Sequence, residues 1–220
     1  MEEKRFAALR YLVRLPEGFD ERKRYPVLFY LHGAGTRNQM EMLKTNPLFL
    51  AMEKNFLPFV CIAPLCEEQS WFDHFHDLKG LVREIAALPV ADPSRIYLTG
   101  LSMGGYGAWQ LAMSIPDAFA ALVPICGGGM YWCAGRLKNL PVWAFHGGLD
   151  KTVFPEESKK MVDAVNKKGG NARLTVFPED GHNAWDSAYG TDELYPWLLS
   201  HKNGALVPED DGFQNAAVYG

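Results

Sequence analysis

The stretch YLTGLSMGGYGAW, residues 97–109, constrains the fold of this chain more than any other. It runs from strand-forming residues into helix-forming residues, and four glycines surround Ser102 on the way. Each glycine inside a helix costs about 1 kcal/mol relative to alanine, so helix stability did not select them. Glycine also removes the Cβ that would collide in a sharp turn. The stretch therefore predicts a strand ending near Thr99, a tight turn at Ser102 and a helix starting at about Met103.

Apolar patterning places this turn in an alternating series of strands and helices. Continuous apolar runs are typical of strands buried on both faces, whereas apolar residues spaced by three and four positions predict helices. We expect strands at 8–16, 25–33, 56–64, 95–100, 121–128, 140–147 and 172–181. We expect helices at 77–88, 103–114, 155–168 and through 193–200. This order predicts the α/β class, with a mostly parallel central sheet and helices on both faces.

The overall composition is that of an ordinary globular chain. The 220 residues are 48% hydrophobic and 22% charged, with a net charge of -4. We place one domain at residues 1–200 and a C-terminal extension without periodicity at 201–220. The acidic balance provides no basic surface, so we expect no nucleic acid and no membrane as partners. The N-terminus has no continuous apolar segment of the signal-peptide kind, which favours a cytoplasmic location. The sequence leaves the oligomeric state open.

Ser102 lies at the centre of a G-x-S-x-G pattern, Gly100 to Gly104, which is typical of a nucleophile elbow. The pattern alone is weak because glycine and serine are common. An aspartate and a histidine then follow, each directly after an expected strand: Asp150 in FHGGLDKTV and His182 in FPEDGHNAW. A serine hydroxyl needs a neighbouring base to become nucleophilic, and the acid orients that base. The three residues predict a Ser-Asp-His catalytic triad.

Other acidic residues and histidines compete for these roles. Asp180 and Asp186 flank the histidine candidate, but residues so near in sequence have difficulty reaching its far ring nitrogen. His32 and His146 each end an expected strand in a His-Gly pair, where hydrogen bonding of the turn is the more ordinary role. The DHFHD stretch, residues 73–77, has no third ligand at a recognisable spacing, so we expect no metal.

An acyl-transfer site also needs donors for the oxyanion of its tetrahedral intermediate. The backbone N–H of Met103, directly after the nucleophile candidate, is one expected donor. The second should come from the loop LHGAGTRN, residues 31–38, which follows an early strand. We assign it to the N–H of Ala34, with Gly33 as the near alternative. This chemistry requires no cofactor.

The four cysteines are Cys61, Cys66, Cys126 and Cys133. They are too few and too widely spaced for a disulfide scaffold, and none forms a C-x-x-C pair. We interpret them as buried free thiols. Whether Cys126 and Cys133 pair in an oxidising compartment stays open.

The segments YLVRLPEGFD, YPVLFYLHGAG, GLSMGGYGAW, HGGLDKTV and GHNAWDSAY together resemble a small α/β-hydrolase. The similarity is to the phospholipase/carboxylesterase, dienelactone hydrolase-like and feruloyl or acetyl-xylan esterase-like branches, and it covers about residues 8–200. It implies Ser102 as nucleophile, Asp150 as acid and His182 as base, with an oxyanion hole at the amides of Met103 and Ala34. It implies a reaction class and not a substrate, because this fold hosts many activities.

We therefore expect a serine esterase that hydrolyses carboxylic esters through an acyl-enzyme. A peptidase or amidase of the same fold is the alternative within enzymes, although amines are poorer leaving groups than alcohols. A catalytically inactive hydrolase fold that serves as a binding module is the alternative outside them. An intact set of serine, aspartate and histidine favours the enzyme.

Aromatic residues near the expected active edge suggest the substrate. Trp71, Tyr106, Trp132 and Trp185 are candidates for a pocket that binds an acyl or sugar group, although core packing explains each of them equally well. Residues 127–141 are the only segment that could roof the site, and they are too few for a helical lid. An open site favours a small-molecule ester with a short-chain or aromatic acyl group, acetyl or hydroxycinnamoyl on a carbohydrate being the leading candidate.

Overall fold

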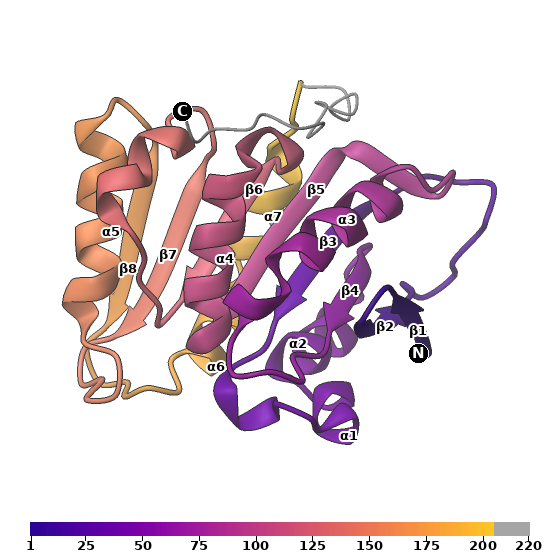
Figure 1. Cartoon of the computed structure of the whole chain (residues 1–220), viewed down its shortest axis with the longest axis horizontal. Helices are drawn as coiled ribbons and strands as arrows, with labels where there is room; N and C mark the ends of the chain where they lie inside the picture. The colour runs from indigo at the N-terminus through magenta and orange to yellow at the C-terminus, as the bar shows by residue number, and fades with distance from the viewer. Residues whose placement is uncertain (205–220) are drawn as a thin grey trace, which may run out of the picture.

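The computed structural model describes residues 1–204, so most of the extension expected at 201–220 lies outside the described residues. Its centre is an eight-stranded sheet with helices on both faces (Figure 1). The strands follow the spatial order β1-β2-β4-β3-β5-β6-β7-β8. Their bounds are β1 Glu2–Phe6, β2 Leu9–Arg14, β3 Tyr25–Leu31, β4 Val60–Pro64, β5 Ala91–Leu101, β6 Ala121–Ile125, β7 Val142–Gly147 and β8 Ala172–Phe177.

The sheet is parallel from β4 through β8, and β2 and β1 extend it in antiparallel pairing. The expected α/β class is confirmed, and each expected strand is present, with shorter bounds for all except β5, which begins four residues earlier and ends one residue later than the expected 95–100. The strand β1 was not expected. Four of its five residues are exposed, so it lacks the apolar alternation by which a strand is recognised.

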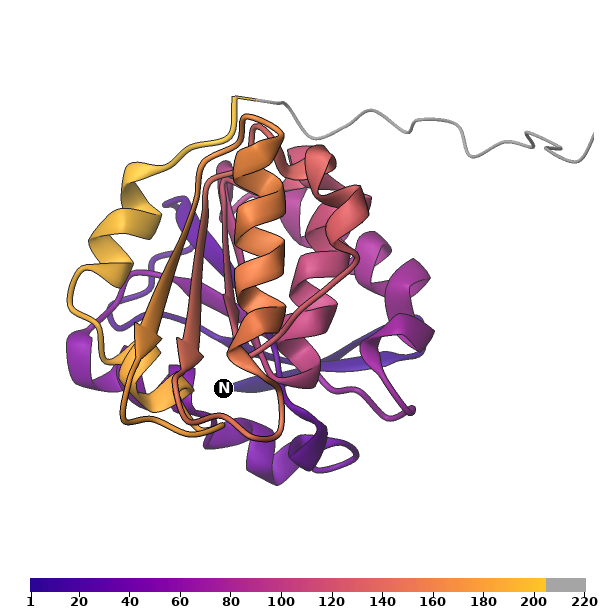
Figure 2. The same ribbon diagram turned by 90° about the vertical axis from the view of Figure 1, so that its left-hand side faces the viewer.

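Helices cover the sheet in two layers (Figure 2). One layer contains α3 Phe75–Ala86, α4 Met103–Ser114 and α5 Pro155–Lys167, and the other contains α1 Met40–Lys44, α2 Pro47–Asn55, α6 Trp185–Tyr189 and α7 Leu194–Ser200. Four short 3-10 helices lie in the connections along the chain: η1 Ala34–Thr36, η2 Trp71–His74, η3 Pro116–Ala118 and η4 Tyr131–Leu137. The four expected helices are present as α3, α4, α5 and α7, and α1, α2 and α6 are additional.

Side chains of the continuous apolar runs pack into two hydrophobic cores, one on each face of the sheet. In β3, Val27, Phe29 and Leu31 pack into the core under α3, α4 and α5. Leu28 and Tyr30 point to the opposite core, under α2, α6 and α7. Because successive side chains of a strand alternate between faces, both sets must be apolar. Among residues 1–204, no helix combines the length and the hydropathy required to cross a membrane.

The glycines around Ser102 are required where β3, β5 and the first turn of α4 meet. A Cβ on Gly104 would overlap the carbonyl oxygen of Leu31, and one on Gly100 would overlap the carbonyl oxygen of Gly104. A Cβ on Gly105 would lie 2.6 Å from the carbonyl oxygen of Ile125 in β6. The obstructing atoms belong to the backbone, so no side-chain rotation can relieve these contacts.

We expect Gly104→Ala to lower the free energy of unfolding by about 3 kcal/mol or more, because overpacking against rigid backbone forces β3 and α4 apart. Urea unfolding followed by circular dichroism measures this loss. Gly135→Ala is the matched control, since its Cβ would lie 3.5 Å from the flexible side chain of Lys168. Equal stability of the two variants would contradict the steric explanation.

Candidate active site

Ser102 lies at the tip of β5 with an unusual backbone conformation. Its φ of 54° and ψ of -119° are outside the regions that non-glycine residues ordinarily adopt. The backbone N–H of Ser102 donates to Ile125 O at 2.9 Å, and Ser102 O accepts from the N–H of Tyr106 at 3.1 Å. Such conformations persist only when surrounding structure holds them. The hydroxyl is therefore presented at the carboxyl edge of the sheet, the lower edge in Figure 1.

His182 lies between Ser102 and Asp150. Its Nε2 is 2.8 Å from Ser102 Oγ, and its Nδ1 is 2.7 Å from Asp150 Oδ2. A carboxylate only accepts, so Nδ1 carries the proton and Nε2 is free to accept from the serine hydroxyl. Residues 80 and 32 positions apart meet here, because the loops after β5, β7 and β8 leave the same edge of a parallel sheet.

Asp150 is 3% exposed and its carboxylate has backbone partners as well as the imidazole. Oδ1 accepts from the N–H groups of Thr152 at 2.9 Å and Val153 at 3.0 Å. Burial raises the pKa of Asp150, but the hydrogen bonds from His182, Val153 and Thr152 outweigh it and the net pKa is lowered. Asp150 is therefore ionised at neutral pH and faces the Nδ1–H of His182.

Neither alternative carboxylate, Asp180 or Asp186, occupies that position in the described part of the chain. The pKa of Asp186 is raised by burial and by the charge of Asp180. That environment disfavours the ionised form that an orienting acid needs.

The loop after β3 approaches Ser102 from the other side. Gly33 and Ala34 line the same cavity as Ser102, and Met103 is the first residue of α4, so its N–H has no acceptor within the helix. The backbone amides expected to bind an oxyanion therefore lie in the loop after β3 and at the start of α4, near the hydroxyl.

His32 holds this loop in place. Its Nδ1 donates to Gly33 O at 2.7 Å, and its Nε2 accepts from the N–H of Cys66 at 2.9 Å. Burial lowers the pKa of His32 to about 4, which keeps the ring neutral as this pattern requires. The expected role of His32 in turn hydrogen bonding is confirmed.

A cavity of about 490 Å³ opens beside Ser102 and His182. Trp185 lines it, with its ring centroid 5.5 Å from that of His182 at an interplanar angle of 83°. Its lining also includes Met42, Thr45 and Pro47 from the segment between β3 and β4, which sequence reasoning missed. The sequence did offer one indication that this segment reaches the site, because it follows the carboxyl end of β3. Within residues 1–204, no Lys, Arg, Asp or Glu lines this cavity.

Three of the four aromatic candidates do not line this cavity. The prediction for Trp71 is wrong: the ring is 1% exposed, and its Nε1 donates to His32 O at 2.9 Å. Trp132 is 66% exposed on η4 and is not part of the cavity lining. Residues 127–141, which the sequence offered as the only segment that could roof the site, run along α4 into η4, which packs against α5.

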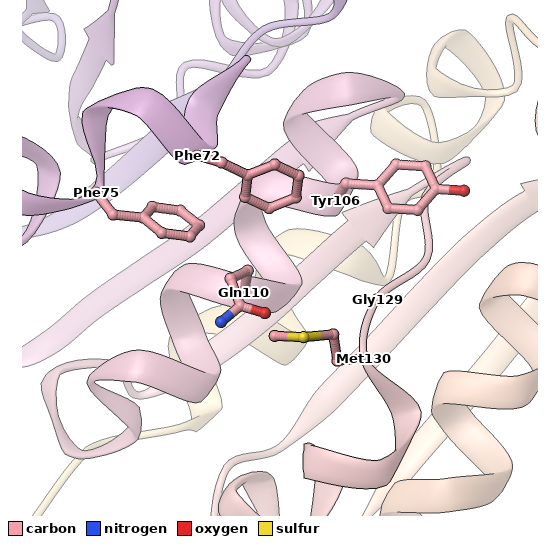
Figure 3. A pocket seen from close by; sticks show the side chains of 6 residues that line it. All are labelled: Phe72, Phe75, Tyr106, Gln110, Gly129 and Met130. Atoms are coloured by element: carbon pink, nitrogen blue, oxygen red, sulfur yellow. The ribbon is translucent and has the colours of Figure 1, made fainter. Parts of the chain in front are cut away.

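Tyr106 lines a second cavity of about 470 Å³, which is distinct from the first (Figure 3). Its other lining residues are Phe72, Phe75, Gln110, Gly129 and Met130. Figure 3 shows that it lies along the outer side of α4, between the η2 region and the segment that precedes η4. Tyr106 therefore faces a neighbouring apolar surface instead of the cavity at Ser102.

Three buried groups lie close enough to share a metal ion by distance. Cys126, His146 and Asp150 offer ligand atoms within 4.8 Å of one another. A thiol must lose its proton to bind a metal, but burial raises the pKa of Cys126 to about 12. His146 Nε2 lies 2.9 Å from Val153 O and must carry a proton, because a carbonyl oxygen only accepts. This donor set does not favour a metal.

All four cysteines are free in the structure, so Cys126 and Cys133 do not pair there.

Known proteins similar to this chain are hydrolases of esters and peptides. Poly(3-hydroxyalkanoate) depolymerase C of Paucimonas lemoignei is 39% identical over an alignment of 172 positions that covers 61% of this chain and 41% of that protein. Dipeptidyl-peptidase 5 of Porphyromonas gingivalis is 22% identical over an alignment of 247 positions that covers 88% of this chain and 34% of that protein. The chain thus spans less than half the length of these curated relatives.

Solved structures share the fold. A thermostable esterase superposes with a TM-score of 0.72 and 30% identity, covering 88% of this chain and 59% of the esterase. Residues 67–189, more than half of the chain, match the Dienelactone hydrolase family. With its eight-stranded, mostly parallel sheet, the chain has the α/β-hydrolase fold and belongs to the dienelactone hydrolase family.

Proposed function

We propose that this chain hydrolyses carboxylic esters through an acyl-enzyme, with Ser102 as nucleophile, His182 as general base and Asp150 as the orienting acid. The single observation that carries the proposal is the hydrogen-bonded chain from Asp150 Oδ2 through both ring nitrogens of His182 to Ser102 Oγ, at 2.7 and 2.8 Å. Membership in a hydrolase family supports the reaction class.

Acylation begins when Ser102 Oγ attacks the ester carbonyl and passes its proton to His182 Nε2. The imidazolium that forms is stabilised by the Asp150 carboxylate. The negative charge on the carbonyl oxygen is stabilised by the N–H groups of Met103 and Ala34. Collapse of the intermediate breaks the bond to the alcohol, whose oxygen takes the proton from His182.

Deacylation repeats the sequence with water. His182 takes a proton from the attacking water, and the second tetrahedral intermediate uses the same two N–H donors. Its collapse releases the carboxylic acid and returns the proton to Ser102 Oγ. All proton transfers are made by groups of the chain and by water, so the reaction needs no cofactor.

The cavity beside Ser102 supports an uncharged substrate. A charged ligand group needs an opposite charge or several donors when it leaves water, and this cavity has no charged side chain among its described lining residues. Trp185 offers a flat apolar surface next to His182. We propose short-chain or aromatic acyl esters as substrates, with acetyl or hydroxycinnamoyl esters of a carbohydrate as the leading candidates.

Peptide hydrolysis is the second candidate, favoured by the similarity to a dipeptidyl-peptidase. A peptide substrate with a free amino terminus needs a carboxylate partner, and none lines the cavity among residues 1–204. Matched p-nitrophenyl esters and p-nitroanilides of one acyl group separate the two activities. Higher kcat/KM on the anilides would favour the peptidase, and an absence of labelling by a fluorophosphonate probe would indicate an inactive binding module.

We expect Ser102→Ala to lower kcat by about 10⁴-fold or more, because no other group is positioned to form the acyl-enzyme. The variant should keep the circular dichroism spectrum of the wild type and should not be labelled by a fluorophosphonate. Ester hydrolysis at a rate near that of the wild type would rule out Ser102 as the nucleophile.

The pH dependence should come from a histidine and not from the aspartate. The lowered pKa of Asp150 keeps it ionised at every pH above its ordinary value of about 3.9, so its protonation cannot reduce activity near neutrality. Histidine ordinarily becomes protonated near pH 6.5, and kcat/KM should therefore fall below about pH 6 to 7.

Asp150→Asn should lower kcat by orders of magnitude, but by less than His182→Ala, because it disturbs the orientation of the base without removing it. Initial rates of p-nitrophenyl acetate hydrolysis provide the measurement. Asp180→Asn and Asp186→Asn are the matched controls and should retain activity. If Asp150→Asn keeps the wild-type activity while Asp180→Asn or Asp186→Asn is inactive, the assignment of Asp150 as the orienting acid is wrong.

We expect Trp185→Ala to lower kcat/KM for a feruloyl ester by about tenfold, because an aromatic contact and its buried area are lost. Trp132→Ala should have no effect, since Trp132 is not part of the cavity lining. Kinetics over a series of acyl chain lengths complete the test. A kcat/KM that rises up to twelve carbons would contradict the proposed preference.

A further inference from the structure

A second histidine contacts the carboxylate that orients His182. Asp150 Oδ2 lies 2.7 Å from His182 Nδ1 and 3.3 Å from His146 Nε2. Oδ1 accepts from the backbone N–H groups of Thr152 and Val153. A carboxylate has about four sites at which it accepts hydrogen bonds. In Asp150 two are used by the backbone and one by His182, and the Nε2 edge of His146 packs against Oδ2.

His146 is held rigidly for this contact. It lies near the end of β7, and its side chain is completely buried. Nε2 is 2.9 Å from Val153 O, so this nitrogen carries a proton and donates it to Val153 O, and it also lies 3.3 Å from Asp150 Oδ2. Nδ1 is 2.7 Å from Ser158 Oγ on α5, and that hydroxyl is 2.8 Å from Gly127 O. The ring is thus tied to α5 and to the loop after β6.

The contact matters because Oδ2 is the atom that sets the orientation of His182. Without His146, Oδ2 would lose the second imidazole that packs against it. Asp150 is 3% exposed, so water has little access to replace the missing contact. Electrostatic contacts with a buried charge are stronger than those in water, and the loss of one changes the geometry of what remains.

We propose that His146 is a positioning residue: its Nε2 edge, 3.3 Å from Asp150 Oδ2, fixes the carboxylate so that Oδ2 faces His182 Nδ1. His146 is not part of the lining of the cavity at Ser102, so it acts on the reaction through Asp150. The inference rests on the proposed ester hydrolysis for its kinetic consequence, while the geometry that it describes is independent of turnover.

The test compares two substitutions at one position. His146→Leu removes the donor and keeps an apolar side chain of similar size, whereas His146→Gln keeps an N–H that can reach toward Oδ2. His74→Leu is the matched control, because His74 is also a buried histidine but is remote from Asp150 in sequence and belongs to η2. Rates are expressed per chain labelled by a fluorophosphonate, which counts only folded sites. The low-field proton resonance of His182 Nδ1–H, assigned by its absence in His182→Ala, reports the Asp150 hydrogen bond directly.

We expect His146→Leu to lower kcat by about tenfold to a hundredfold with KM within about twofold, because the loss of a polar contact with a buried charged group disturbs the orientation of the base. The His182 resonance should shift or broaden. His146→Gln should recover most of kcat and the resonance, and His74→Leu should keep the wild-type kcat per labelled chain. A wild-type kcat with an unchanged resonance in His146→Leu would overturn the proposal. So would a loss of kcat that leaves the resonance unchanged.

Ser158→Ala covers the case in which His146→Leu does not fold. It removes the anchor of Nδ1 and leaves the imidazole in place, so a perturbed His182 resonance would support the proposal and an unchanged one would overturn it. If the wild type neither hydrolyses esters nor reacts with the fluorophosphonate, the proposed function fails. The resonance in His146→Leu then still decides the role of His146.

Discussion

The close approach of three backbone segments around Ser102 is the constraint on which the rest of this structure depends. The carbonyl of Leu31, the end of β5 and the first turn of α4 meet at distances that only glycine allows at positions 100 and 104. This approach holds Ser102 at a φ of 54° and points its hydroxyl out of the sheet. A looser junction would let the chain enter α4 gradually and would bury the serine in the first helical turn.

The parallel sheet turns this local constraint into a site. Parallel strands bring their carboxyl ends to one edge, so loops that are distant in sequence meet there. His182 follows β8 and Asp150 follows β7, and both reach the edge at which β5 presents Ser102. The Asp150 carboxylate can be buried in an ionised state because two backbone N–H groups and the imidazole of His182 supply its hydrogen bonds. Burial and rigid positioning of this charge therefore have the same origin.

Part of the uncharged lining of the cavity beside Ser102 comes from a segment that contains no catalytic motif. Met42, Thr45 and Pro47 belong to the segment with two short helices between β3 and β4, and they bring apolar and neutral polar groups to a cavity whose described lining carries no charge besides the imidazole when protonated. The fold hosts many hydrolases, and the elbow is the part that they can share. Selectivity for one ester over another must therefore reside in segments of this kind.

By itself, the sequence determined the order of strands and helices, the α/β class and the three side chains that the structure brings within hydrogen-bond distance. The helix α4 begins and ends at the expected residues, Met103 and Ser114, because glycine spacing and apolar periodicity are local properties of the chain. The tertiary structure decided which aromatic residues reach the cavity. Trp71 and Trp185 both follow a strand, yet Trp71 is buried by contacts with His32 and Gly107 while Trp185 lies against His182. Apolar periodicity indicates that a side chain faces away from water, but whether that side chain fills a core or lines a cavity depends on which distant segments pack around it.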